Sequence, residues 1–279
     1  MHNSTGNGGR HRHSFNSFNA YKQKERKLLI EYVILGLIQG ILEWLPVSSE
    51  GSLVLIIVNA LKINFSTAIS LSIYAHLGTA LAVTVKYNRV FKETILLRDQ
   101  ETFKLLTMST LGTCITAVPI LLYGLKNIEF NETVNVLIGL LLMLTGAILL
   151  IGKKAHYTLK RENPSIVNYF VLGLLQGFAV MPGLSRSAIT VSYLLYSGLT
   201  PKKALKYSFL VSVPVVLGAC VLEAVTGEIY PVSILICLTV FSFITGLLTM
   251  NALLKVAEKV NFGMFCIFFG LLALLLNIA

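Results

Sequence analysis

Charged residues interrupt the long apolar stretches of this sequence at only a few positions, and these are Glu43, Glu50, Arg186 and Glu223. A charge at membrane depth is costly, so it indicates a functional site or a buried structural pair. Three of the four lie in, or directly before, two short polar breaks rich in Pro, Gly and Ser, at 44–52 and 181–187. The two breaks are therefore the candidate site.

The first break follows a helix that carries Gln39 and Glu43, which are four residues apart and so share one face. Pro46 is expected to end that helix. Ser48 and Ser49 would then begin the next helix, where free backbone N–H groups and a partial positive charge favour phosphate.

The second break places Ser185, Arg186 and Ser187 at a matching helix start. Arginine can hold two phosphate oxygens at once. If the breaks meet near mid-depth, two helix N-termini and Arg186 converge with Glu43 on one phosphate site. The structural alternatives are a Glu–Arg pair that only locks two halves together and serines that only cap helices.

The composition places these residues in a membrane. Of 279 residues, 55% are hydrophobic and 13% are charged, against about 25% charged in soluble domains. The net charge of +10 fits basic loops beside anionic lipid, and the apolar runs exclude a nucleic-acid-binding protein. The cysteines lie inside apolar runs without CxxC spacing, which predicts buried thiols: Cys114, Cys220, Cys237 and Cys266.

Segments long enough to span a bilayer are expected at 67–86, 105–125, 134–152, 204–225, 232–250 and 262–278. Two further apolar regions, 28–61 and 166–199, are each split by a polar break into pieces shorter than a span. Such a break at membrane depth is tolerated only inside the protein or facing water, so both regions are predicted to be re-entrant hairpins. Residues 1–27 form a polar, His-containing tail without a signal-peptide pattern and are expected to be disordered.

The two hairpins are related in sequence, because Gly36-Leu-Ile-Gln39-Gly40 precedes the first break and Gly173-Leu-Leu-Gln176-Gly177 precedes the second. Each hairpin is followed by three spans, which gives repeats at 28–152 and 166–279 within one membrane domain. An odd number of spans inverts the second repeat relative to the first. The predicted fold is an all-α polytopic membrane protein, built twice from one re-entrant hairpin plus three transmembrane helices.

The loop charges give an orientation. Lysine and arginine gather in the loops at 86–104, 153–161, 202–206 and 255–259, whereas the loops at 126–133 and 226–231 carry one and none. Basic loops favour the cytoplasm. The basic stretch at 22–27 disagrees, because this topology puts the tail outside.

The motifs resemble those of the undecaprenyl-diphosphate phosphatases, also called bacitracin-resistance proteins, from residue 28 to the end of the chain. The first signature is Gly36-Leu-Ile-Gln39-Gly40-Ile-Leu-Glu43-Trp44-Leu-Pro46-Val-Ser48-Ser49-Glu50-Gly51-Ser52. The second is Pro182-Gly183-Leu-Ser185-Arg186-Ser187. Two further segments are similar to family segments: His76-Leu-Gly78-Thr79 and Tyr207-Ser208-Phe209-Leu-Val-Ser-Val-Pro214.

This resemblance implies removal of one phosphate from a C55-type polyprenyl diphosphate, with Mg²⁺ or Ca²⁺ as cofactor. It implies catalytic roles for Glu43, Ser49 as nucleophile or phosphate ligand, and Arg186. The expected substrate-binding residues are Ser48, Gly51, Ser52, Gly183, Ser185 and Ser187. Gln39, Glu43 and Glu50 are the candidates for holding a metal or acting as base.

The sequence departs from the family at three positions of the first break. Gln39 stands where the family has a glutamate, Ser52 stands at the motif histidine, and Glu50 replaces a small hydroxyl residue. Losing the histidine removes the obvious base for Ser49, and losing a carboxylate weakens a site for a hard cation. Glu50 is the predicted replacement, whereas His76 is expected to be structural.

The leading hypothesis is a multi-pass phosphatase of the cell membrane that acts on a polyprenyl diphosphate lipid, contacts membrane lipids and binds no nucleic acid. It could form a homodimer. A polyprenyl-phosphate transporter or flippase is the alternative, since inverted repeats suit alternating access. A catalytically inactive family member is a third.

Overall fold

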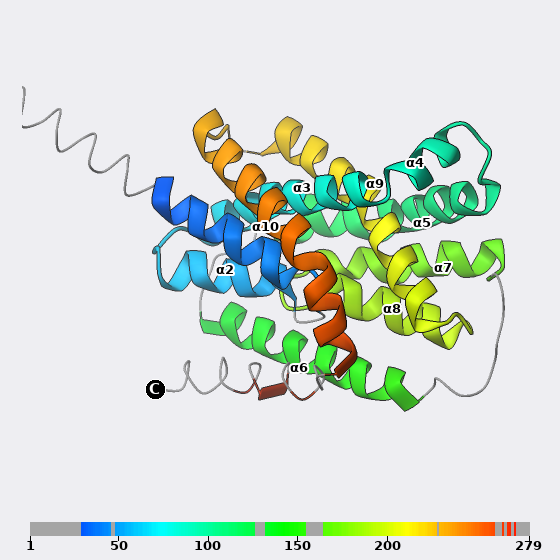
Figure 1. Ribbon diagram of the computed structural model, residues 1–279. Coiled ribbons are helices and arrows are strands. Elements are labelled where there is room, and N and C mark those ends of the chain that lie inside the picture. Colours follow the sequence, from blue (N-terminus) through cyan, green and yellow to red (C-terminus); the bar gives the residue numbers. More distant parts are fainter. Residues whose placement is uncertain are drawn as a thin grey trace, which may run out of the picture.

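The computed structural model is a bundle of helices and describes residues 29–45, 48–125, 132–154, 164–227, 229–259, 264, 267, 268 and 271 (Figure 1). Every regular element in these ranges is helical. In chain order they are a first helix Leu29–Leu42, α2 Ser49–Asn59, α3 Phe65–Lys86, α4 Asn88–Ile95, α5 Gln100–Pro119, the π-helical η1 Ile120–Leu125, α6 Glu132–Lys154, α7 Ile166–Gly177, the 3-10 turn η3 Phe178–Val180, α8 Arg186–Tyr196, α9 Pro201–Thr226 and α10 Val232–Lys259.

Four helices in the described ranges are long and apolar enough to cross a membrane: Phe65–Lys86, Gln100–Tyr123, Pro201–Thr226 and Val232–Ala252. They confirm four of the six expected spans and make the chain a multi-pass helical membrane protein. The expected span 134–152 falls on α6. The apolar helix described within it, Val136–Ile148, is shorter than a span. The expected span 262–278 and the tail 1–27 lie almost wholly outside the described residues.

The ends of the helices follow from the local sequence. Helix starts are fixed by side chains that accept a backbone N–H of the first turn, and these N-caps are Ser48, Asn64, Asp99, Ser165 and Ser185. Pro201 begins α9, where its missing N–H costs nothing. Two of the caps, Ser48 and Ser185, belong to the polar breaks.

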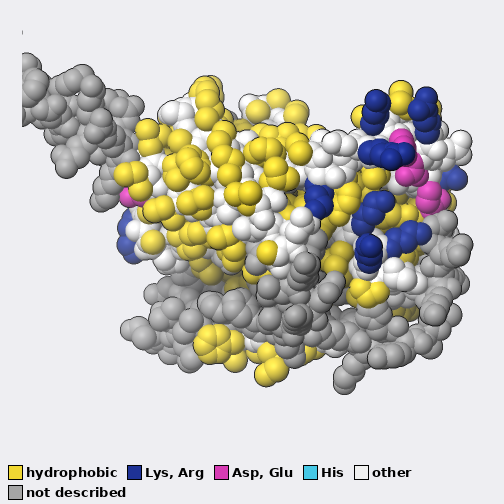
Figure 2. All heavy atoms as spheres, in the orientation of Figure 1, with side chains coloured by type: hydrophobic (Ala, Val, Ile, Leu, Met, Phe, Trp, Pro, Cys, Tyr) yellow, Lys and Arg dark blue, Asp and Glu magenta, His cyan; other side chains and the backbone are white. Residues whose placement is uncertain are grey.

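The lipid-facing surface is apolar, as Figure 2 shows over much of the visible face. Large hydrophobic side chains point outward from the spans, among them Leu111, Ile115, Leu217, Val221, Ile244 and Leu248. In a bilayer this arrangement is favourable, because lipid tails rather than water surround the bundle.

Small residues bring the helices into close contact. A Cβ on Gly173 of α7 would lie 2.1 Å from the backbone oxygen of Ser109 in α5. A Cβ on Gly40 of the first helix would lie 2.6 Å from the backbone nitrogen of Gly246 in α10. Lipid gives no hydrophobic drive for helix association, so such close backbone approaches carry much of the packing. Gly78 of α3 approaches α10 in the same way.

Hydroxyl groups reinforce the same two interfaces. Thr113 of α5 donates to the backbone oxygen of Gly173 at 3.1 Å, and Thr249 of α10 donates to that of Gly40 at 3.1 Å. The helix that enters each break is therefore held by a small-residue face and by a threonine from a neighbouring long helix.

Basic side chains gather at one end of the bundle, around α4 and the starts of α5 and α9 (Figure 2). The described members are Lys86, Arg89, Lys92, Arg98, Lys104, Lys202, Lys203 and Lys206. Two of the loops that the charge pattern assigned to one side thus meet at the same end. That this end faces the cytoplasm stays a prediction.

Candidate functional site

The two polar breaks touch each other through glycine. A Cβ on Gly51, in the first turn of α2, would lie 2.6 Å from the backbone nitrogen of Gly183. Gly183 has a φ of 105°, a conformation that side-chain-bearing residues rarely adopt. Glycine is therefore needed on both sides of this contact, and the breaks meet as the sequence predicts.

Ser48 connects the breaks by hydrogen bonds. Its Oγ accepts from the backbone N–H of Gly51 at 3.3 Å and from that of Gly183 at 3.2 Å, and it donates to the backbone oxygen of Leu184 at 3.4 Å. Ser48 has a φ of 55°. This strained backbone is maintained by contacts on both sides of the junction.

Thr145 of α6 fixes the second break by two hydrogen bonds. Its Oγ1 donates to the backbone oxygen of Gly183 at 3.1 Å and accepts from the backbone N–H of Ser185 at 3.1 Å. Ser185 then caps α8. The start of α8, and with it Arg186, is positioned by a third helix.

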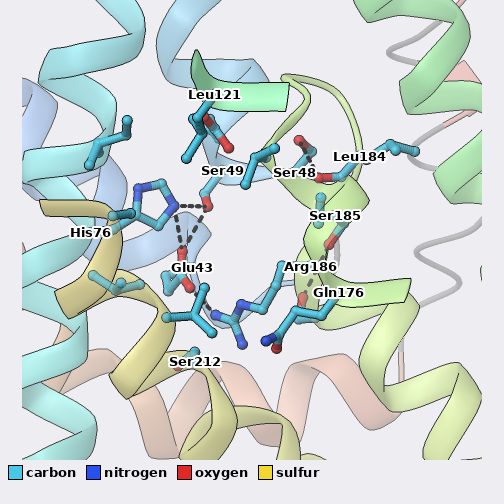
Figure 3. Close-up of a pocket in the computed structure, with 18 of the residues that line it drawn as sticks. Glu43, Ser48, Ser49, His76, Leu121, Gln176, Leu184, Ser185, Arg186 and Ser212 are labelled. Atoms are coloured by element: carbon cyan, nitrogen blue, oxygen red, sulfur yellow. Dashed lines mark hydrogen bonds and ion pairs between the residues drawn. The ribbon is translucent and has the colours of Figure 1, made fainter. Parts of the chain in front are cut away.

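Glu43 is the centre of the site and is 6% exposed. Its Oε1 pairs with the Arg186 guanidinium. Its Oε2 accepts from Gln39 Nε2 at 2.9 Å and from Ser49 Oγ at 2.8 Å, and lies 3.3 Å from His76 Nε2. Figure 3 shows the carboxylate between His76 and Arg186. This buried charge is therefore fully partnered.

Arg186 is held at both ends of its fork. One nitrogen binds Glu43, and Nη1 donates to the backbone oxygen of Ser208 in α9 at 3.0 Å. Ser208 Oγ in turn shares a 2.6 Å hydrogen bond with Thr190 of α8. The guanidinium is thus pre-oriented by Glu43 and by α9, as anion stabilisation requires.

His76 of α3 reaches this network from the opposite side. Its Nε2 lies 3.3 Å from Ser49 Oγ, and its Nδ1 lies 2.7 Å from the backbone oxygen of Ser72. The expectation that His76 is structural is not what the geometry favours, because the ring lines the same cavity as Ser49 and Arg186.

These residues surround a cavity whose open space is about 770 Å³, including its mouth. The polar part of the lining is formed by Glu43, Ser48, Ser49, Glu50, His76, Gln176, Ser185, Arg186, Ser187 and Ser212. The apolar part includes Ile73, Leu121, Val215, Val216 and Ala219. The lining therefore offers contacts to a polar group and to an apolar chain.

The cavity brings together most of the predicted site residues. Those that line it are Glu43, Ser48, Ser49, Glu50, Ser185, Arg186 and Ser187. Gly51 and Gly183 form the junction instead of the lining, and Ser52 Oγ donates to the Ser48 backbone oxygen at 3.1 Å. Gln39 is fully buried and orients Glu43 through its amide. Pro46 lies outside the described residues.

Three polar lining residues were not predicted as site residues: His76, Gln176 and Ser212. Gln176 is 2% exposed, and its Oε1 has no hydrogen-bond partner among the described residues. The repeat offered a signal for it, since Gln176 occupies the position that Gln39 has in the first hairpin. Ser212 lies in the segment 207–214, which also resembles the family, but the resemblance gave this serine no role.

The cavity has few side chains that could be ligands of a divalent cation. Both oxygens of Glu43 are already committed, and no group of three or more His, Cys, Asp or Glu within the described ranges could hold a metal. Glu50 is the further carboxylate on the cavity wall. Mg²⁺ commonly uses one or two carboxylates together with substrate phosphates. Among the described residues the cavity thus offers one carboxylate besides Glu43, and a cation there would need most of its ligands from a bound molecule.

Comparison with known proteins agrees with the motifs in the breaks. Residues 32–275 match the family model described as "Bacitracin resistance protein BacA". The chain belongs to this family. An undecaprenyl-diphosphatase of Methanothrix thermoacetophila is 37% identical, covering 89% of this chain and 96% of the relative. Undecaprenyl-diphosphatases of Methanococcoides burtonii and Thermosipho africanus are 37% and 34% identical, each covering 88% of this chain and 97% or 98% of the relative.

Replacing Ser48 by alanine should destabilise the family fold at the junction. The change leaves the buried N–H of Gly183 without its acceptor, which costs about 1–3 kcal/mol. Thermal unfolding in detergent should show a lower midpoint than the wild type, whereas Ser233→Ala at an exposed position of α10 should not change it. Equal midpoints for both variants would contradict the role given to Ser48.

Proposed function

We propose that this protein is a membrane phosphatase that hydrolyses undecaprenyl diphosphate to undecaprenyl phosphate and inorganic phosphate. The observation that carries the proposal is the convergence of Ser49, Glu43 and Arg186 on one cavity at the junction of the two breaks. Family membership and the names of the relatives agree with it.

Recognition of the terminal phosphate falls to the helix starts. α2 begins at Ser49 and α8 begins at Arg186, so both present unpaired backbone N–H groups near the cavity. Together with the guanidinium they supply the positive potential that a diphosphate needs. Ser185 and Ser187, which are 3.1 Å apart through their hydroxyls, add donors to the polar part of the lining.

In the proposed reaction Ser49 Oγ attacks the terminal phosphorus, and the bond from this phosphorus to the bridging oxygen breaks. Undecaprenyl phosphate leaves with that electron pair, and water then displaces the serine oxygen from phosphorus. Glu43 holds Ser49 in place through the 2.8 Å hydrogen bond. Arg186 stabilises the charge on the transferring phosphoryl group.

The isoprenoid chain is assigned to the apolar part of the cavity lining. Ile73 of α3, Leu121 of η1, and Val215 and Val216 of α9 line it. An undecaprenyl chain is far longer than the cavity, so most of it would lie along the lipid-facing helices. This placement keeps the phosphates at the junction and the hydrocarbon in a hydrocarbon environment.

An inverted repeat with two re-entrant hairpins is part of the proposal. α2, α7 and α8 have 11, 12 and 11 residues, too few for the roughly 20 that a span needs. The packing also supports it, because Gly40 of the first hairpin contacts α10 and the equivalent Gly177 of the second contacts α5. Each hairpin thus packs on the second long helix after the other hairpin. Location in the cell membrane and a homodimer stay predictions.

A divalent cation, Mg²⁺ or Ca²⁺, is proposed as the cofactor, with Glu50 as its protein ligand. When bound it would neutralise charge on the diphosphate oxygens. Ser49 and Arg186 would still perform the positioning and stabilisation derived above.

The function and the role of Arg186 are tested together by phosphate release from pure undecaprenyl diphosphate. The wild type should release phosphate. Arg186→Lys should be slower, by an amount that corresponds to about 2–4 kcal/mol of lost transition-state stabilisation, because the point charge of lysine cannot replace the planar guanidinium. Lys202→Arg, at an exposed position of α9, is the control. A wild type that releases no phosphate would overturn the proposal, and movement of labelled lipid phosphate across liposomes would then identify a transporter.

Glu50→Gln should weaken the use of the cation. We expect the Mg²⁺ concentration for half-maximal activity to rise by about 10-fold or more, since metal affinity commonly falls by that order when a supporting group is lost. Glu93→Gln, in an exposed ion pair with Arg89, is the matched control. An unchanged Mg²⁺ dependence in Glu50→Gln would remove Glu50 from the cation site.

Single-cysteine labelling in a background without the native cysteines tests the topology. The loops at 153–161 and 202–206 should label from the cytoplasmic side, and those at 126–133 and 226–231 from the outside, because lysine and arginine are concentrated in the first pair. Labelling of both pairs from the same side would refute the inverted repeat.

A further inference from the structure

The position of the family's motif histidine is taken by Ser52, and this side chain does not serve Ser49. Ser52 Oγ donates to the Ser48 backbone oxygen at 3.1 Å and does not line the cavity. A serine hydroxyl is a weak nucleophile unless a base takes its proton. The proposed phosphatase therefore needs a base from another element.

Glu43 is poorly suited to that task. It contacts the hydroxyl of Ser49, but its oxygens also accept from Gln39 and pair with Arg186. A carboxylate stabilised by several donors and a guanidinium favours its charged form and accepts a proton reluctantly. Glu43 is better placed to orient Ser49 and to balance positive charge beside it.

His76 has the geometry of a base. A backbone carbonyl only accepts hydrogen bonds, so the contact of Nδ1 with the Ser72 oxygen at 2.7 Å requires the proton on Nδ1. In the neutral ring this leaves the lone pair on Nε2, which lies 3.3 Å from Ser49 Oγ. The hydroxyl of Ser49 donates its one proton to Glu43 Oε2 at 2.8 Å, so it has to rotate toward Nε2 before the proton is transferred. Ser49, His76 and the Ser72 oxygen are thus arranged like the nucleophile, the base and the group that orients the base in other enzymes with an activated serine.

The charges around the ring suit an imidazolium formed during the reaction. Glu43 lies 3.3 Å from Nε2, and Glu50 of α2 lines the same cavity. Arg186 is the cation that lines the cavity in the described part of the chain, and its guanidinium is turned to Glu43 rather than to the ring. The two carboxylates outnumber the one guanidinium, which is already paired, and they therefore stabilise positive charge on the histidine.

We propose that His76 is the catalytic base of this protein and performs from α3 the role of the histidine that the family carries at position 52. The inference rests on the proposed phosphatase function. Nε2 takes the proton of Ser49 Oγ as this oxygen bonds to the terminal phosphorus and undecaprenyl phosphate leaves. The imidazolium returns the proton to the serine oxygen when water displaces it, and both hydrogens of the water leave on inorganic phosphate.

Two substitutions of His76 separate catalysis from structure. His76→Gln keeps a polar group near Nε2, and His76→Asn keeps an N–H near Nδ1 for the Ser72 oxygen, but neither carries a base. Leu81→Ala, on the lipid-exposed side of the same helix, is the control. All variants are compared in detergent for thermal midpoint, kcat and KM in phosphate release, and the dependence of kcat on pH.

We expect kcat to fall by about 100-fold or more in both variants, the usual contribution of a general base, with KM and the thermal midpoint close to the wild type. The decline of kcat at acidic pH, caused by protonation of His76 in the wild type, should disappear. Adding Ser52→His to His76→Gln should restore at least about 10-fold of the lost turnover, since it returns a base to the family position.

A His76→Gln kcat within about threefold of the wild type, or a slow variant that keeps the acidic decline, would overturn the role of His76. A double variant as slow as His76→Gln would overturn the exchange of roles with position 52. Either result with an active wild type leaves the phosphatase function intact. An inactive wild type refutes the phosphatase function itself.

Discussion

The structure depends on one buried ion pair between Glu43 and Arg186, which come from opposite breaks. Burying two charges costs several kcal/mol each, and removing one partner of such a pair commonly costs about 3–5 kcal/mol. The pair persists because Gln39 and Ser49 supply further donors to Glu43, and the Ser208 carbonyl accepts from Arg186. A site that binds anions can thus be kept assembled while it is empty of substrate, with positive charge held in place beforehand.

The rest of the bundle serves to bring these charges to one depth. Glycines on the two helices that enter the breaks allow a close approach to the neighbouring long helix, which is α10 for the first break and α5 for the second. Thr145 of α6 fixes the start of α8. Gly51 and Gly183 permit the breaks to touch. Backbone N–H and C=O groups of the second break form hydrogen bonds with the hydroxyls of Ser48 and Thr145. Lipid could not supply these hydrogen bonds.

The sequence predicted the residues whose presence in a membrane is costly. Glu43 and Arg186 stood out as charges in apolar surroundings, and the serines and glycines beside them identified the breaks. The sequence did not place His76 beside Ser49, because apolar and small polar residues are spread around all sides of α3 and periodicity does not tell which face meets the site. That face is set by packing against α9 and α10. Gln39 was expected to hold a metal or act as base, but its amide donates to Glu43, a role that spacing alone does not distinguish.

The claim that Glu43 and Arg186 form one functional unit is tested most directly by a double-mutant cycle on phosphate release. The turnover of Glu43→Gln, Arg186→Gln and the double variant would be measured with the wild type at one pH and cation concentration. Residues that act as a unit are strongly non-additive. We expect a double variant that is no slower than the slower single variant, and losses that simply multiply would contradict a single functional unit.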